Sequence, residues 1–311
     1  MSEILKLSPS FKDYIWGGNK LMIQYGVKDM DRVAEAWVLS AHPDGPSYLP
    51  DGTTFADALE KMGADAVGKN AAAFKDFPQL IKLIDAQSDL SVQVHPSDEY
   101  ALANEGQFGK TEMWYILDAE EGAGIYYGFQ RDVTRAEMEE AIRTNTLTDI
   151  LRFVPVQKGE SYFIPSGTIH AIGKGLLIAE IQQNSNVTYR VYDYGRKDAQ
   201  GNTRPLHVEK ALEVSDLTRA TDAVEPQQTV VEGCTITQVA KCPYFSVAKL
   251  EINDGVSLVN SDSFQAVLIT DGEGTIDGIP FVQYDTFFIP ADYGPAVLRG
   301  KFEALVSCIQ E

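Results

Sequence analysis

Three short segments of the chain carry residue types that bind metal ions. Gln93 and His95 are two residues apart, as are Lys110 and Glu112, and His170 follows a tight turn at the start of a further strand. Alternate residues of a β-strand point to one face, so each pair can point into one interior. Together the segments offer imidazole nitrogen, carboxylate oxygen and amide oxygen. Zinc accepts these ligands, and a site that also keeps an open position is of the catalytic kind.

The elements that must position these residues are mostly short strands. Segments rich in β-branched and aromatic residues are separated by Gly, Pro and Asp at intervals of about ten residues. The strands predicted in this way include Leu90–His95, Met113–Leu117, Gly124–Tyr127, Ser161–Ile164, Leu176–Gln182 and Asn186–Tyr192. Their spacing predicts an all-β barrel or sandwich.

Three segments break this pattern and predict helices. Thr54–Met62 and Ala66–Phe74 are expected to be short helices, the first with Thr53 or Thr54 as its N-cap. Asp132–Thr144 gives the clearest helical signal, with an apolar stripe at helical spacing and a threonine and a glutamate placed as in a capping box. We therefore expect helical insertions on a β body.

The chain also repeats itself. The segment Phe163–His170 resembles Phe288–Pro295, and each is preceded by a strand, a turn and another strand. In this alignment the final histidine of the first copy faces a proline, and Glu112 faces approximately Gln265. The second copy keeps residues that form the fold and loses the potential ligands. The repeat predicts two related β-barrel units, the first chemical and the second structural.

The domain boundary is expected near Leu217–Val230, where the sequence turns polar. This predicts a catalytic metal-binding domain over residues 1–217, with helical insertions at about 54–74 and 132–152. Residues 218–311 are then a degenerate β domain without metal ligands.

Composition and charge limit the class of protein. Apolar residues make up 44% of the 311 residues and charged residues 23%, which is typical of a folded globular protein. The net charge of −19 argues against nucleic-acid binding, which normally needs a basic surface. A small anionic substrate is still possible, because a few converging cations can make a local positive pocket and outer charges are screened over about 10 Å.

Location is predicted from the cysteines and the apolar runs. The three cysteines are an odd number without a C-x-x-C pair, which fits a reducing compartment better than a disulfide framework. No run reaches the roughly 18 apolar residues that a membrane span needs, and the N-terminus has no secretory signal pattern. The sequence predicts a cytoplasmic protein that does not enter a membrane.

An ordered set of motifs over most of the first 215 residues resembles one family. The motifs are Trp16-Gly-Gly18, Ala34-Glu-Ala-Trp37, Ser40-Ala-His-Pro43, Leu80-Ile-Lys82, Leu90-Ser-Val-Gln-Val-His-Pro96, Gly109-Lys-Thr-Glu-Met-Trp114, Ile164-Pro-Ser-Gly-Thr-Ile-His-Ala171, the segment from Glu180 to Arg190, and Tyr192-Asp-Tyr194. They resemble the zinc-dependent mannose-6-phosphate isomerases of the cupin superfamily (type I phosphomannose isomerases), in their short bacterial form. The resemblance implies a mostly β fold of two cupin-type β-barrel (jelly-roll) units with short helical insertions.

The resemblance also implies roles for single residues. The implied ligands of one zinc ion per chain are Gln93, His95, Glu112 and His170. The implied pocket residues are Lys82, Lys110, Glu180 and Arg190, with Glu35 nearby. One departure is Thr111, where many relatives have proline, and it leaves the ligand spacing intact. His42 and His207 fall outside this set, and we expect a structural role in a turn for the first and a surface or interface position for the second.

The implied reaction interconverts mannose 6-phosphate and fructose 6-phosphate through an enediolate. A divalent metal and the positive charge of Arg190 would stabilise this intermediate. The general base that moves the proton is either Glu180 or Lys110, whose pKa a neighbouring cation would lower. Lys82 is expected to help neutralise the phosphate.

Two other functions fit parts of the pattern. Two histidines and one carboxylate also occur in iron oxygenases of the same shape, although Gln93 as a fourth ligand and the charged pocket argue against that chemistry. A catalytically silent sugar-phosphate-binding protein would keep the same pocket. The sequence leaves open the C2 configuration of the hexose phosphate, the metal used in the cell and the oligomeric state.

Overall fold

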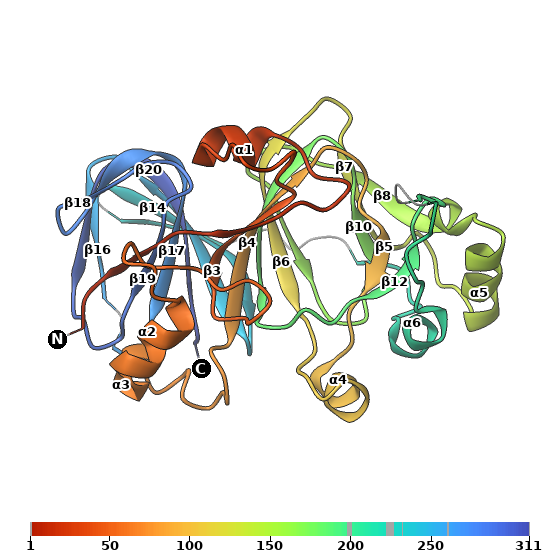
Figure 1. Ribbon diagram of the computed structural model, residues 1–311, viewed down its shortest axis with the longest axis horizontal. Coiled ribbons are helices and arrows are strands. Elements are labelled where there is room, and N and C mark those ends of the chain that lie inside the picture. The colour runs from red at the N-terminus through yellow and green to blue at the C-terminus, as the bar shows by residue number, and fades with distance from the viewer. Residues whose placement is uncertain (1, 198–200, 222–226, 232, 260, 311) are drawn as a thin grey trace. The chain divides into compact units, whose positions relative to one another are not determined.

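A computed structural model describes residues 2–197, 201–221, 227–231, 233–259 and 261–310 (Figure 1). Strands predominate and the helices are short, so the prediction of a mostly β fold with helical insertions is confirmed. In the part of the chain that is described, no helix combines the length and the apolar character needed to cross a membrane.

The backbone divides into two compact units that are not contiguous in the sequence. One consists of residues 1–11, 36–82 and 224–311, and the other of residues 12–35 and 83–223. Three strands run along the chain from one unit into the other: β2 (Ser10–Lys12), β3 (Glu35–Ser40) and β4 (Gln79–Ala86). The contiguous division into 1–217 and 218–311 stays a prediction, and residues 222–226 of its expected boundary lie outside the described residues.

The first unit contains a nine-stranded antiparallel sheet. Its strands follow the order β1-β19-β17-β20-β15-β14-β13, with β16 paired to β20 and β18 to β17. Their bounds are β1 Leu5–Leu7, β13 Gln227–Val231, β14 Cys234–Cys242, β15 Phe245–Ile252, β16 Gly255–Leu258, β17 Gln265–Ile276, β18 Ile279–Phe281, β19 Thr286–Ile289 and β20 Ala296–Cys308. The helices of this unit are α2 (Phe55–Met62) and α3 (Ala64–Val67).

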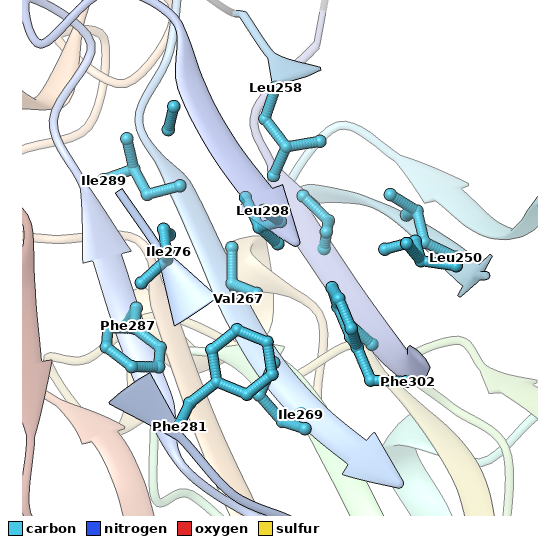
Figure 2. Close-up of a cluster of buried hydrophobic side chains, with 14 of the residues drawn as sticks. Leu250, Leu258, Val267, Ile269, Ile276, Phe281, Phe287, Ile289, Leu298 and Phe302 are labelled. Carbon is cyan, nitrogen blue, oxygen red and sulfur yellow. The ribbon is translucent and has the colours of Figure 1, made fainter. Parts of the chain in front are cut away.

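Apolar side chains fill the core of this first unit. Figure 2 shows Val267, Phe281, Phe287, Leu298 and Phe302 converging from neighbouring strands. Phe281 contacts Phe302 edge to face, with 4.8 Å between the ring centroids, a favourable aromatic geometry. The core of this unit is therefore apolar.

The second unit contains a five-stranded sheet in the order β12-β5-β10-β7-β8, and a ladder in which β6 pairs with both β11 and β9. The strand bounds are β5 Val92–Val94, β6 Glu112–Ala119, β7 Gly124–Phe129, β8 Leu151–Pro155, β9 Ser161–Ile164, β10 His170–Ile172, β11 Leu176–Gln183 and β12 Tyr189–Tyr192. The helices are α1 Lys20–Tyr25, α4 Asp98–Asn104, α5 Arg135–Arg143 and α6 Val208–Val214, with a 3-10 turn at Leu147–Asp149. Helix α6 lies beside both α5 and β12 (Figure 1).

Local capping chemistry explains two helices, and a glycine ends a third. Thr54 accepts a hydrogen bond from the N–H of Asp57 and begins α2, and Thr134 and Glu137 form the predicted capping box at the start of α5. The helix predicted over Ala66–Phe74 is wrong: α3 is a single turn that ends before Gly68, which has a φ of +81°. Beyond it the N–H of Asn70 donates to the carbonyl of Asp262, so a tertiary contact takes a backbone group that a helix would need.

The internal repeat is present in the strand pairing. Glu112 of β6 lies opposite Ile164 of β9, and Gln265 of β17 lies opposite Ile289 of β19. These pairs match the sequence alignment of the two copies. Each copy therefore supplies an equivalent strand pair, and only the first has a predicted metal ligand at the aligned position. Closure of either unit into a barrel stays a prediction.

Candidate metal centre

Hydrogen-bonded strands place three of the predicted residues in one row of the five-stranded sheet. Gln93 of β5 lies opposite His170 of β10 on one side and opposite Arg190 of β12 on the other. Paired residues of neighbouring strands project from the same face of a sheet. The strand register alone therefore brings His170 and Arg190 next to Gln93, although they lie 77 and 97 positions further along the chain.

Glu112, at the start of β6, completes a buried cluster with two histidines. Its Oε1 lies 3.2 Å from Nε2 of His170, and its Oε2 lies 3.7 Å from Nε2 of His95. The three ligand atoms all lie within 4.8 Å of one another, and the three side chains are at most 1% exposed. This spacing suits three ligands around a single cation.

Backbone carbonyls orient both imidazole rings. Nδ1 of His95 lies 2.9 Å from the carbonyl oxygen of Val187, and Nδ1 of His170 lies 2.8 Å from that of Thr168. A carbonyl oxygen only accepts, so each Nδ1 carries the proton and each Nε2 presents its lone pair toward Glu112. This is the usual arrangement of metal-binding histidines, in which the second nitrogen is fixed by a hydrogen bond.

The centre contains polar atoms that the protein itself does not satisfy. Among the described residues, Nε2 of His95 and both carboxylate oxygens of Glu112 are buried without a well-aligned hydrogen-bond partner. Lys110 Nζ lies 2.7 Å from Glu112 Oε2 as an ion pair, but this contact is poorly aligned as a hydrogen bond. Buried acceptors of this kind are costly unless a ligand pairs with them. Two imidazole nitrogens and a carboxylate therefore fit a zinc ion.

Gln93 lies at the edge of this cluster. Its Nε2 lies 3.4 Å from Nε2 of His170. The two ends of a side-chain amide are nearly indistinguishable in shape, so a half-turn of the amide puts Oε1 at the same place. An oxygen there can be the fourth protein ligand that the sequence predicts.

A buried ion-pair network adjoins the cluster. Lys110 Nζ lies 3.4 Å from Oε1 of Glu180, whose Oε2 accepts a 2.9 Å hydrogen bond from Nε1 of Trp114. The Trp114 ring also packs edge-on against His170, with 5.3 Å between the ring centroids. Trp114 therefore holds a predicted catalytic carboxylate and a predicted metal ligand in place together.

The carboxylates of this network shift the pKa of Lys110. Burial lowers the pKa of Lys110, but the carboxylates of Glu112 and Glu180, with a smaller contribution from Glu35, outweigh burial and raise the pKa above its usual range. The predicted lowering of this pKa requires a bound cation, so it stays a prediction. Glu112, Glu180 and Glu35 thus place negative charge around Lys110.

The histidines are kept neutral and Glu112 is kept ionised. Burial lowers the pKa of His95 to about 4, with a further contribution from Lys110. Burial likewise lowers the pKa of His170. Burial would raise the pKa of Glu112, but Lys110 and the histidines hold it well below its usual range. Metal ligation requires neutral imidazole and ionised carboxylate, so the protein keeps its ligands in the binding form.

Arg190 is half-buried on the face that carries the ligands. Its Nε donates to Oγ of Ser91 at 3.3 Å, and its Nη1 donates to the carbonyl of Pro205 at 3.2 Å. Nearby, Asp193 pairs with Arg196 and with Arg204, whose Nε and Nη2 lie 2.7 and 2.6 Å from the carboxylate oxygens. Three arginines, Arg190, Arg196 and Arg204, thus lie close together in the second unit, two of them paired with Asp193.

The remaining predicted residues lie in other settings. Glu35 is buried at the start of β3 and acts on Lys110 through its charge. Lys82 is buried in β4, with its Nζ 4.8 Å from the centre of the Trp37 ring, and belongs to the first unit. His42 has the expected structural role, because its Nδ1 accepts the N–H of Asp44 in a turn. His207 is half-buried and bonds to Arg190.

Sequence reasoning missed the groups that orient the ligands. Trp114 is two residues after Glu112 on β6, so strand alternation could have placed both on one face. The carbonyls of Val187 and Thr168 leave no sequence signal, because every residue has one. Their role is visible only in the folded chain.

Comparison with protein families supports one identity for the chain. A model described as the catalytic domain of type I phosphomannose isomerase matches residues 4–124. A second, described as the cupin domain of mannose-6-phosphate isomerase, matches residues 235–309. The second match confirms the predicted cupin-type fold for the C-terminal part of the chain.

Individual proteins agree with this result. The chain is 38% identical to mannose-6-phosphate isomerase ManA of Bacillus subtilis over 98% of its own length and 99% of that protein. A crystal structure of the mannose 6-phosphate isomerase from Bacillus subtilis superposes with a TM-score of 0.90 at 35% identity, covering 98% of this chain and 99% of that one. A mannose 6-phosphate isomerase bound with zinc and yttrium, 16% identical, covers the full length of both chains with a TM-score of 0.79 and shares the fold.

Proposed function

The chain belongs to the type I phosphomannose isomerase family, and from this premise we propose that it interconverts mannose 6-phosphate and fructose 6-phosphate with one zinc ion per chain. The observation that carries the proposal is the buried cluster of His95, Glu112 and His170, whose ligand atoms lie within 4.8 Å of one another beside a lysine–glutamate pair. This arrangement combines a cation site with groups that can move a proton.

Gln93, His95, Glu112 and His170 would hold the zinc ion. When bound, zinc would supply a Lewis acid that stabilises negative charge on the substrate oxygens without a change of redox state. The carbonyls of Val187 and Thr168 keep both imidazoles oriented. Burial of the cluster excludes water and strengthens its electrostatic interactions.

Lys110 and Glu180 would move the proton between C1 and C2 of the sugar. They lie 3.4 Å apart and are both almost fully buried. We propose that Glu180 accepts the proton from carbon and that Lys110, whose pKa the neighbouring carboxylates raise, stays charged and stabilises the oxyanion. The reverse assignment, with Lys110 as the base, requires that a bound cation lowers its pKa.

Arg190 would stabilise the negative charge that develops in the reaction, and Lys82 would bind the anionic substrate. Arg190 lies beside Gln93 in the sheet, so its charge is available to the developing enediolate. For Lys82, and for Glu35 as a further substrate-binding residue, the proposal rests on the family motifs alone. The cytoplasmic location also stays a prediction.

The experiment is a coupled assay of fructose 6-phosphate formation from mannose 6-phosphate, after chelation and after zinc is added back. Activity should stop with the chelator and return with zinc, and metal analysis should give one zinc per chain. The variant Glu180→Gln should lose turnover and keep its zinc, whereas Glu112→Gln should lose both.

The same assay tests the other functions. A silent binding protein would bind mannose 6-phosphate without turnover in the zinc-loaded form. An oxygenase would need iron and would lose activity on oxidation. The family match favours neither alternative.

A further inference from the structure

Arg190 lies in β12, an edge strand of the five-stranded sheet as far as the described residues show. Strand β12 is the first in the order β12-β5-β10-β7-β8. One edge of β12 therefore pairs with β5, and its other edge faces away from the sheet. Backbone groups on the other edge need partners from elsewhere in the chain, because unpaired N–H and C=O groups are costly when buried. The position of Arg190 therefore depends on what covers this edge.

His207 binds the backbone of Arg190 at this edge. The N–H of Arg190 donates to Nδ1 of His207 at 3.2 Å, and the N–H of His207 donates to the carbonyl of Arg190 at 2.8 Å. The imidazole nitrogen thus takes the place that a carbonyl of a neighbouring strand would have. These two hydrogen bonds, called the clasp below, join His207 to the backbone of Arg190.

The place of His207 in its own helix supports this assignment. It is the N-cap residue of α6, a position where a side chain usually accepts a hydrogen bond from the first turn of the helix. The His207 side chain makes no such bond. Its ring is directed to Arg190 instead of to the helix that it precedes.

The same segment also holds the guanidinium group. The carbonyl of Pro205, two residues before His207, accepts the Nη1–H of Arg190, and Ser91 accepts its Nε–H. Residues 205–207 therefore fix Arg190 at both its backbone and its side-chain end. A shift of this segment would therefore change the position of the guanidinium group that Pro205 holds.

The surroundings keep the ring in the form that can accept. Burial lowers the pKa of His207, as do the charges of Arg190 and Lys210, against an opposing effect of Glu105. The ring of Tyr189 lies 6.1 Å from it, centroid to centroid. A neutral ring keeps a lone pair on Nδ1 for the N–H of Arg190.

We propose that His207 is a positioning residue that fixes Arg190 for the isomerase reaction through the acceptor at its Nδ1. The inference rests on the proposed function, in which Arg190 faces the developing negative charge. Its role is distinct from metal binding, because the contacts described for it are with Arg190, Tyr189 and the segment that it caps.

Three variants test the role of this one atom. Asparagine places an oxygen where His207 has Nδ1, glutamine places its oxygen near Nε2, and alanine provides no acceptor. Displacement of Arg190 weakens an interaction that matters most in the transition state. His207→Ala and His207→Gln should therefore lower kcat about ten-fold with KM within about two-fold. His207→Asn should keep kcat within about three-fold of the unsubstituted enzyme, and all three should bind one zinc.

Hydrogen exchange gives a readout that does not depend on turnover. The amide of Arg190 should exchange faster in the alanine and glutamine variants than in the unsubstituted protein, and asparagine should restore its protection. An asparagine variant as impaired as alanine, or an alanine variant with unchanged kcat and exchange, would overturn the proposal. If the unsubstituted protein does not turn over mannose 6-phosphate, the proposed function fails, while the exchange rates still decide whether the clasp exists.

Discussion

Acidification should destabilise the metal-free protein through His95. This ring is buried, and its pKa falls from 6.5 to about 4 in the folded chain. Between these values an unfolded chain binds a proton at this residue and the folded chain does not. Stability is therefore lost as the pH falls through this window, since protons favour the state that binds more of them.

The magnitude follows from the two pKa values. Each pH unit between them contributes about 1.4 kcal/mol, because the unfolded state gains one proton per molecule there. Between pH 6.5 and pH 5 the loss from His95 alone is about 2 kcal/mol, and it reaches about 3 kcal/mol at pH 4. A loss of this size is a large part of the stability of a typical domain.

The assay compares urea unfolding of the chelated protein at pH 7 and pH 5 with that of His95→Gln. The variant lacks the titrating ring, so its free energy of unfolding should fall by about 2 kcal/mol less over this interval. His170 and the other titrating groups are present in both proteins, so the difference reports the loss of the His95 ring together with its effect on the pKa of the neighbouring Glu112. With only four histidines in the chain, the C2 proton of His95 can also be followed directly by NMR.

Parallel pH dependence in the two proteins would refute this reasoning. A resonance of His95 that titrates near 6.5 would refute it equally, because burial would then have no effect on the ring. In the zinc-loaded protein the loss should extend to lower pH than in the metal-free protein, since a bound metal competes with the proton for the same nitrogen and lowers the pKa of the folded chain further.

Three further substitutions test the site and the fold. Trp114→Phe removes the hydrogen-bond donor to Glu180. It should lower kcat between about 10-fold and 100-fold in the coupled assay, because a hydrogen bond to a charged group is worth about 1.5–3 kcal/mol. As a control, Trp16→Phe changes another buried tryptophan and should leave kcat within about two-fold. Gly167→Ala places a methyl group 3.0 Å from a carbonyl oxygen at a φ of +88°, and this strain before His170 should weaken zinc binding about ten-fold in chelator competition. Phe287→Ala should destabilise the first unit by about 3–5 kcal/mol in calorimetry with zinc content unchanged, because its side chain is fully buried in the core of Figure 2.

The sequence determined the local parts of this protein. Strand alternation predicts that Gln93 and His95 share a face, as do Lys110 and Glu112, and the structure joins both histidines to Glu112. The capping box at Thr134 and the cap at Thr54 are local chemistry and were predicted correctly. Such features depend on residues a few positions apart, whose geometry is set by the backbone period.

Only the tertiary structure decided the contacts between distant segments. It ends α3 at Gly68 instead of continuing the helix to Phe74. It also brings the carbonyl of Val187 to His95 and His207 to the backbone of Arg190. The sequence does not mark which backbone groups will bind a distant residue, and their hydrogen-bond partners depend on the tertiary fold. The sequence therefore determined which residues could do the chemistry, and the fold decided their orientation and their charge, because burial and nearby charges act through space and not along the chain.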